Sequence, residues 1–147
     1  MLNAKVTGQW LFIDGILVAV LGLIHLGFAP TVYSDIASEF ELGMSLALIY
    51  MFIVAGLSLV LAGWIVLISA RKFIKRDRLA GTMIVTVGVY ILVGGLGAVM
   101  AMPRNVFSYI LLGLGVMEIL PAIFYWKPSW QLHHEKLRDE DISIPAN

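Results

Sequence analysis

Hydrophobic and polar positions along this chain fall into long, separate blocks. Four blocks are apolar, and they cover residues 10–30, 42–70, 81–102 and 105–126. A helix needs about 20 apolar residues to cross the hydrocarbon core of a bilayer. Each block reaches that length, so the pattern predicts four transmembrane helices.

The polar segments between the blocks predict the topology. A basic run, RKFIKRDR at 71–78, separates the second block from the third. Nine of the ten Lys and Arg residues lie in this run or in the segments that flank the first and fourth blocks. The remaining one, Arg104, lies between the third and fourth blocks. Because cytoplasmic loops carry the excess of basic residues, both termini are predicted to be cytoplasmic.

The segment TVYSDIASEFE, residues 31–41, is the predicted outer loop, and its charged residues are all acidic. Apolar side chains recur every four positions in it, at Val32, Ile36 and Phe40. This spacing is typical of one face of a helix, so we expect a short amphipathic helix on the membrane surface. Ser38 and Glu41 have the spacing of a capping box, which predicts that the second span begins there.

Composition supports a membrane protein. The chain is 60% hydrophobic and 14% charged, whereas about 25% of the residues in soluble domains are charged. We therefore expect an all-α integral membrane four-helix bundle, in the cytoplasmic (inner) membrane if the source is bacterial. Residues 1–130 form its single four-span transmembrane domain, and residues 131–147 form a polar cytoplasmic tail. The formal net charge is zero, which argues against nucleic acid as a partner, and the absence of Cys excludes disulfides and thiolate chemistry.

Small residues predict where the helices approach one another closely, because close backbone approach drives helix association in lipid. The pairs at helical spacing are Gly15 with Ala19, Ser58 with Ala62, Gly56 with Gly63, Gly88 with Gly95, Gly94 with Ala98, and Gly97 with Ala101. They favour a compact bundle with a further interface to another chain. The expected partners are therefore the lipid bilayer and other membrane subunits or copies of the same chain.

Three ionisable residues interrupt the apolar blocks, namely Asp14, His25 and Glu118. A charge at the centre of a membrane helix costs about 3 kcal/mol, so each is a functional candidate. Asp14 and His25 are eleven positions apart, which places them on one helix face but about 16 Å apart along its axis. In depth, Asp14 and Glu118 are predicted to lie closer to each other than either lies to His25.

One interpretation joins these residues into a polar stripe inside the bundle. Glu118 then exchanges a proton, and Pro121 opens the helix one turn further on. His25 then faces the outer half of the bundle, within reach of Tyr33. On this interpretation the candidate catalytic residues are His25 and Glu118, and the candidate ligand-binding residues are Asp14, His25, Tyr33 and Glu118.

The alternative interpretation is structural. Asp14 then caps the first turn of the first span or reaches the polar surface, where a negative charge suits a helix N-terminus. His25 then donates a hydrogen bond to a backbone carbonyl or a Tyr of a neighbouring helix, and Glu118 is neutral and hydrogen-bonded. The adjacent His133 and His134 do not share a helix face and have no third ligand, so no metal site is predicted. We also expect no cofactor.

The layout is similar to that of a known kind of membrane protein. The segments GLIHLGFAP (22–30) and VAGLSLVLAG (54–63), together with the basic inner loop, resemble small four-span bacterial membrane proteins of the broad DoxX-like kind. The resemblance covers the spans and implies the four-helix fold. It carries no functional residue onto this chain.

For function, the sequence favours a non-enzymatic accessory or interaction subunit of a membrane complex, or a homo-oligomer. The chain is short and has no dense polar site. Two alternatives stay open. One is a bundle that binds or transforms a quinone or another lipid-like substrate, with Glu118 and His25 as acid and base. The other is a small proton-coupled transporter in which Glu118 is the coupling carboxylate.

Overall fold

The computed structural model describes residues 4–75, 77–120 and 123, and all regular elements in this part of the chain are helices. They are α1 (Ala4–Gly27), α2 (Ala29–Glu39), α3 (Leu42–Phe73), α4 (Arg78–Ala101) and a further helix, Val106–Leu120, which we name the C-terminal helix. Three of them, α1, α3 and α4, are long and apolar enough to cross a membrane. The C-terminal helix is also apolar but shorter.

Two parts of the predicted layout fall outside the described residues. The predicted fourth span extends to residue 126, and the C-terminal helix covers only its first part. The predicted tail, residues 131–147, is likewise not described, and neither are His133 and His134.

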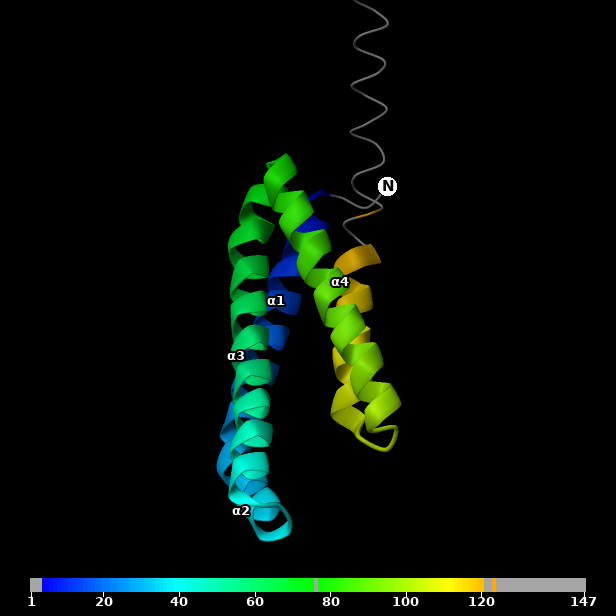
Figure 1. Ribbon diagram of the computed structural model, residues 1–147. Coiled ribbons are helices and arrows are strands. Elements are labelled where there is room, and N and C mark those ends of the chain that lie inside the picture. Colours follow the sequence, from blue (N-terminus) through cyan, green and yellow to red (C-terminus); the bar gives the residue numbers. More distant parts are fainter. Residues whose placement is uncertain (1–3, 76, 121–122, 124–147) are drawn as a thin grey trace, which may run out of the picture.

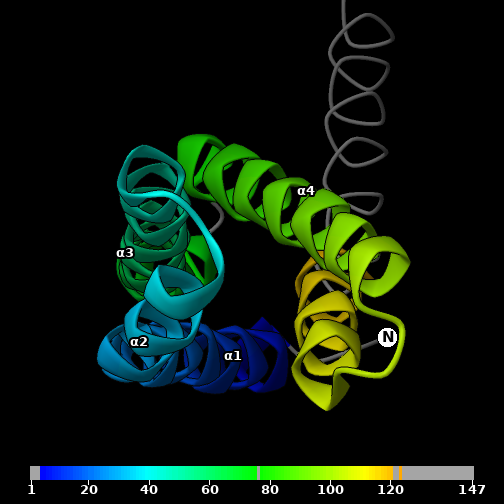
Figure 2. The ribbon, with the colours of Figure 1, turned by 60° about the horizontal axis from the view of Figure 1, so that its bottom comes forward.

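The long helices lie side by side, up and down along one direction (Figure 1). The start of α1 and the turn between α3 and α4 lie at one end of the molecule, and α2 and the turn after α4 lie at the other. Viewed from that second end, the order around the molecule is α3, α1, the C-terminal helix and α4 (Figure 2). The chain therefore forms two helix pairs, α1 with α3 and α4 with the C-terminal helix.

Each pair is held together by glycines at close backbone contacts. A Cβ atom added at Gly63 of α3 would lie 2.5 Å from the nitrogen of Ala19 and 2.5 Å from the carbonyl oxygen of Gly15, both on α1. In the other pair, a Cβ atom at Gly95 would lie 2.6 Å from the nitrogen of Leu112. The predicted small-residue positions thus mark both contacts, as expected where helices associate without a hydrophobic driving force.

Two apolar clusters connect the pairs. The first, which we name the turn cluster, lies beside the α3–α4 turn and contains Leu11, Ala70, Phe73, Ala80 and Ile84. The second, the central cluster, contains Val18, Leu59, Ala62, Val66, Val87, Ile91 and Leu114. The turn cluster contains residues of α1, α3 and α4, and the central cluster contains residues of these three helices and of the C-terminal helix. Each cluster therefore joins the two pairs. Side-chain packing of this kind fixes how the two pairs sit against each other.

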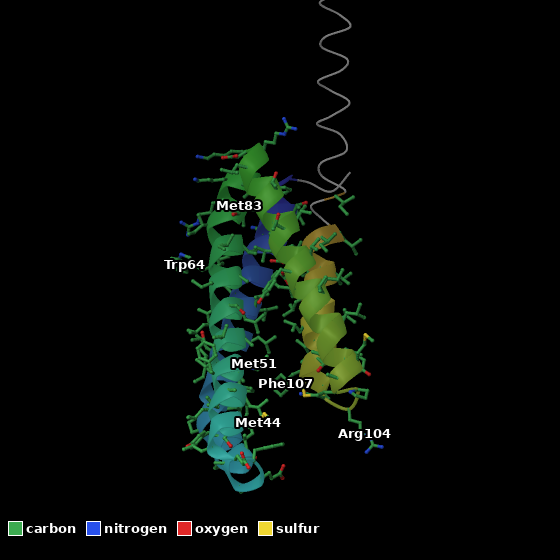
Figure 3. The ribbon with its side chains drawn as sticks, in the orientation of Figure 1. Met44, Met51, Trp64, Met83, Arg104 and Phe107 are labelled. Carbon is green, nitrogen blue, oxygen red and sulfur yellow. The ribbon has the colours of Figure 1, made fainter. Side chains whose placement is uncertain are left out.

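The outward faces of the three long helices are apolar. Leu23 of α1, Leu61 of α3 and Val93 of α4 are each more than half exposed. Trp64 of α3 points away from the molecule in Figure 3. A soluble monomer does not expose apolar surface on this scale, so the exposed faces suit hydrocarbon as the surrounding medium.

The segment after α1 forms the helix α2, with Pro30 in its first turn. Val32 and Ile36 are half-buried, whereas Phe40 is exposed at the end of the helix. The capping box predicted at Ser38 and Glu41 is wrong. Ser38 lies within α2, and its hydroxyl donates to the carbonyl oxygen of Asp35 at 2.7 Å, a local bond that competes with capping. Glu41 is itself the N-cap residue of α3 and makes no side-chain capping bond.

Candidate functional site

Asp14 lies well inside α1. The helix begins at Ala4, so Asp14 is about 15 Å along its axis. Its side chain is 3% exposed. The prediction that Asp14 caps the first turn or reaches the polar surface is wrong, because the helix begins before the apolar block and no acidic residue falls in its first turn.

The neighbours of Asp14 along α1 belong to the two apolar clusters. Leu11, one turn before it, is part of the turn cluster. Val18, one turn after it, is part of the central cluster. Residues three and four positions apart share one helix face. The carboxyl group of Asp14 therefore projects from α1 at the level between the two clusters.

Glu118 projects from the C-terminal helix at the same level. It is completely buried and follows Leu114 of the central cluster by one turn. Opposite it on α4 is Gly88, where an added Cβ atom would lie 3.1 Å from Cβ and 3.3 Å from Oε2 of Glu118. Gly88 follows Val87 of the central cluster and is one turn from Ile84 of the turn cluster. The missing side chain at Gly88 thus leaves room for the carboxyl group.

Asp14 and Glu118 form a pair. Their carboxyl groups are close enough to interact electrostatically. Within the described part of the chain, none of their four carboxyl oxygens has a hydrogen-bond partner. The sequence predicted that these two residues lie at similar depth. Both project at the level between the two clusters, near enough to interact electrostatically but without a hydrogen bond between them.

The basic side chains that the structure describes lie toward the ends of the molecule, and none of them hydrogen-bonds to the carboxyl oxygens of Asp14 or Glu118. The Arg71 guanidinium lies over the Phe12 ring, 5.8 Å from its centroid. Arg71, Lys72, Lys75 and Arg78 lie at or beside the α3–α4 turn. Arg104 lies at the opposite end, in the turn after α4 (Figure 3). The carboxyl pair therefore has no counter-charge from these residues.

Such a pair has a definite chemical requirement. A charged carboxylate in apolar surroundings is costly unless it is paired and hydrogen-bonded. Two carboxyl groups near each other in apolar surroundings also disfavour each other's ionisation unless a positive charge compensates them. The pair is therefore expected to hold a proton or a cation, and it is suited to binding positive charge.

His25 lies elsewhere. Its Nε2–H donates to the carbonyl oxygen of Phe52 at 3.1 Å, because a carbonyl can only accept. Its ring stacks on the Phe52 ring with centroids 3.8 Å apart and planes 18° from parallel. The hydrogen bond to a backbone carbonyl of a neighbouring helix is the one that the structural interpretation predicts.

The predicted polar stripe is thus divided. His25 faces α3 and not the side chain of Tyr33, which is exposed on α2. Eleven residues of α1, about 16 Å, separate His25 from Asp14, the residue that interacts with Glu118. Asp14 and Glu118 therefore lie near enough to interact electrostatically, whereas His25 is engaged with Phe52.

Metal binding finds no support in the described residues. Over 4–75, 77–120 and 123, no group of three His, Asp or Glu side chains is close enough to hold a metal ion. The pair of carboxyl groups alone is short of the six to eight oxygen ligands that Ca²⁺ takes.

Comparison with known proteins identifies no relative. No protein-family model, no curated protein and no solved structure matches this chain. The residues that remain to indicate the function of this chain are the buried Asp14 and Glu118.

Proposed function

We propose that this chain is a small multi-pass membrane transporter that moves protons through the Asp14–Glu118 pair. The observation that carries the proposal is the burial of both carboxyl groups without a hydrogen-bond partner for any of their oxygens in the described part of the chain. Ionisable residues inside a membrane are costly, and in pumps and transporters they form proton relays. A purely structural carboxyl group is expected to be hydrogen-bonded.

The proposed topology has four spans, with the C-terminal helix as the described part of the fourth and both termini in the cytoplasm. Two observations support it. The start of α1 and the basic α3–α4 turn lie at the same end of the molecule (Figure 1). Arg104 lies at the opposite end, together with α2 (Figure 3). Basic residues concentrate on the cytoplasmic side, so α2 is proposed to lie on the outer surface.

The two apolar clusters supply a reason why protons would cross by alternating access and not through an open water-filled path. The turn cluster lies between the pair and the cytoplasmic end, and the central cluster lies on its other side. Water and ions do not cross packed apolar side chains. Access to the pair from either side therefore requires the two helix pairs to separate at one cluster, as in the rocking of one helix bundle against another.

The experiment is proton movement in proteoliposomes that contain a pH-sensitive dye. With a potassium gradient and valinomycin imposing a potential negative inside, the wild-type protein is expected to acidify the lumen faster than protein-free liposomes do. Glu118→Gln and Asp14→Asn each remove an exchangeable proton, so both are expected to reduce the rate to that of protein-free liposomes.

The matched control is His25→Gln, which alters an intramembrane ionisable residue outside the pair. It is expected to retain proton movement at the wild-type rate, because the His25 ring hydrogen-bonds to and stacks on Phe52 of α3, away from the pair. An unchanged rate in Glu118→Gln, or a wild-type rate equal to that of protein-free liposomes, would contradict the proposal.

A non-enzymatic interaction subunit is the second candidate function. It is favoured by Gly94 and Gly97 of α4, where an added Cβ atom would meet no described atom within 4 Å. Small residues on an outward helix face allow another membrane helix to approach closely. This candidate predicts the opposite result in the same experiment, because a subunit without a transport site moves no protons on its own.

A further inference from the structure

Building on the proposed proton movement, we propose that the Asp14–Glu118 pair also carries a second solute, an organic cation with apolar substituents, which exchanges with protons there. The inference names the substrate class of the same site. It stands on three features, namely the charge of the pair, the side chains around it, and the apolar residues that lead to it.

The charge of the pair selects a cation. In their ionised form the four carboxyl oxygens carry negative charge and only accept hydrogen bonds, so the unpartnered oxygens favour a cation over an anion. A proton and a solute cation satisfy the same requirement, and neither leaves room for the other. Two ligands that compete for one site are exchanged for each other when the site opens alternately to the two sides.

The surroundings of the pair select an organic cation over a metal ion. The neighbours of the pair in the two clusters are aliphatic. On α1, Asp14 is flanked at one turn by Leu11 and Val18. Glu118 follows Leu114 by one turn, and Ile84 is one turn from Gly88, the residue opposite Glu118. A hard metal ion needs many oxygen ligands or retained water, and these aliphatic side chains supply neither. A substituted ammonium or phosphonium ion needs only charge neutralisation and apolar contact. Both are present.

Apolar side chains also lead to the pair from the α2 end. Phe107 lies eleven residues before Glu118 and seven before Leu114, so the three share one face of the C-terminal helix. On α3, Met44 and Met51 share a face with Ala62 of the central cluster by the same spacing rule. Phe107, Met51 and Met44 are 48%, 68% and 56% exposed.

These exposed residues lie where the helix pairs separate. Figure 1 shows the α1–α3 pair and the α4–C-terminal pair diverging toward the α2 end, and Figure 3 places Met44, Met51 and Phe107 in this region. Met side chains are flexible and polarizable and adapt to varied apolar ligands, and an aromatic face attracts cations. An apolar cation arriving from the membrane thus meets favourable contacts before it reaches the carboxyl groups.

The test uses the full chain in detergent, with benzyltrimethylammonium and tetraphenylphosphonium as probes. Calorimetry measures binding, and a pH indicator in weak buffer measures proton release. We expect at least one probe to bind with release of protons and with an affinity that falls as the pH is lowered. Glu118→Gln and Asp14→Asn are each expected to weaken this binding by about tenfold or more.

Tetraphenylborate is the matched control, because it has the shape of tetraphenylphosphonium and the opposite charge. It is expected to interact equally with the wild-type protein and both variants, through partition into the micelle alone. Thermal unfolding of each variant verifies that it is folded, and whichever of the two variants is folded suffices for the comparison.

The outcomes separate this inference from the proposed function. Suppose that the protein moves protons in proteoliposomes. If neither cation then binds, or if both cations bind to Glu118→Gln and Asp14→Asn as tightly as to the wild type, the proposed substrate class is wrong and the proton pathway stands. If protons do not move, the proposed function fails first. Binding without proton release contradicts the exchange of the two ligands at one site.

Discussion

Gly63→Ala is expected to lower the free energy of unfolding by about 2–3 kcal/mol, the upper part of the range for overpacking a well-packed contact. The added methyl group would lie 2.5 Å from the backbone nitrogen of Ala19 and from the backbone oxygen of Gly15. Backbone atoms cannot move aside as a flexible side chain can, so α1 must shift along its whole contact with α3. Because α1 carries Asp14, the shift also disturbs the carboxyl pair.

Gly97→Ala is the matched control for this substitution. Gly97 also lies within a helix, so both substitutions share the helix-propensity gain of about 1 kcal/mol. Its added methyl group would meet no described atom within 4 Å. Unfolding by denaturant in mixed micelles, followed by tryptophan fluorescence, measures both variants. Equal stability of the two would show that α1 and α3 are not in close backbone contact.

Glu118→Met is expected to stabilise the fold by about 1–3 kcal/mol, the cost of a buried polar group without a partner, and to abolish proton movement. Methionine has a similar length and flexibility, so it fits the space beside Gly88 without the carboxyl oxygens. A gain in stability at the expense of activity is characteristic of a functional site that is kept despite its cost.

The comparison with Glu118→Gln sharpens this prediction. Glutamine keeps a buried polar group at the same place, so its gain is expected to be smaller than that of methionine. Thermal unfolding in detergent at neutral pH ranks the three proteins. If Glu118→Met is less stable than the wild type, Glu118 makes a structural contribution that the carboxyl pair does not explain.

The sequence predicts the long helices from the length of its apolar blocks, and the depth of the carboxyl residues from their positions within these blocks. The apolar blocks are long because hydrocarbon demands it, and Asp14 and Glu118 could be placed by counting residues from the ends of these blocks. The contact of α1 with α3 could also be anticipated from Gly15, Ala19, Gly56 and Gly63, since backbones approach closely only where side chains are small.

The start of α1 could not be read from hydropathy. Polar residues such as Gln9 continue the helix toward its N-terminus, so the helix begins earlier than the apolar block and Asp14 moves into its interior. An apolar block marks what lies in hydrocarbon, whereas hydrogen bonds and caps mark where a helix begins. Hydrogen bonding likewise decides the place of Ser38, whose hydroxyl donates to a carbonyl oxygen within α2 and does not cap α3.

The partners of the polar residues depend on how the helices are rotated, which the sequence does not state. His25 and Asp14 share one face by spacing, yet His25 contacts α3 at Phe52 and Asp14 interacts with the C-terminal helix at Glu118. Gly88 was predicted only as a packing residue through its spacing to Gly95. Its closeness to Glu118 depends on how α4 packs against the C-terminal helix, which the spacing of glycines does not determine.

Cross-linking in native membranes tests most directly whether positions 14 and 118 lie close together between α1 and the C-terminal helix. The chain contains no Cys, so Asp14→Cys with Glu118→Cys introduces the only two thiols, and a short bifunctional thiol reagent can bridge them. The account predicts rapid bridging of this pair and none for His25→Cys with Glu118→Cys, scored by mass spectrometry of the joined peptides. Failure of the first pair to bridge, or equal bridging of both pairs, would contradict it.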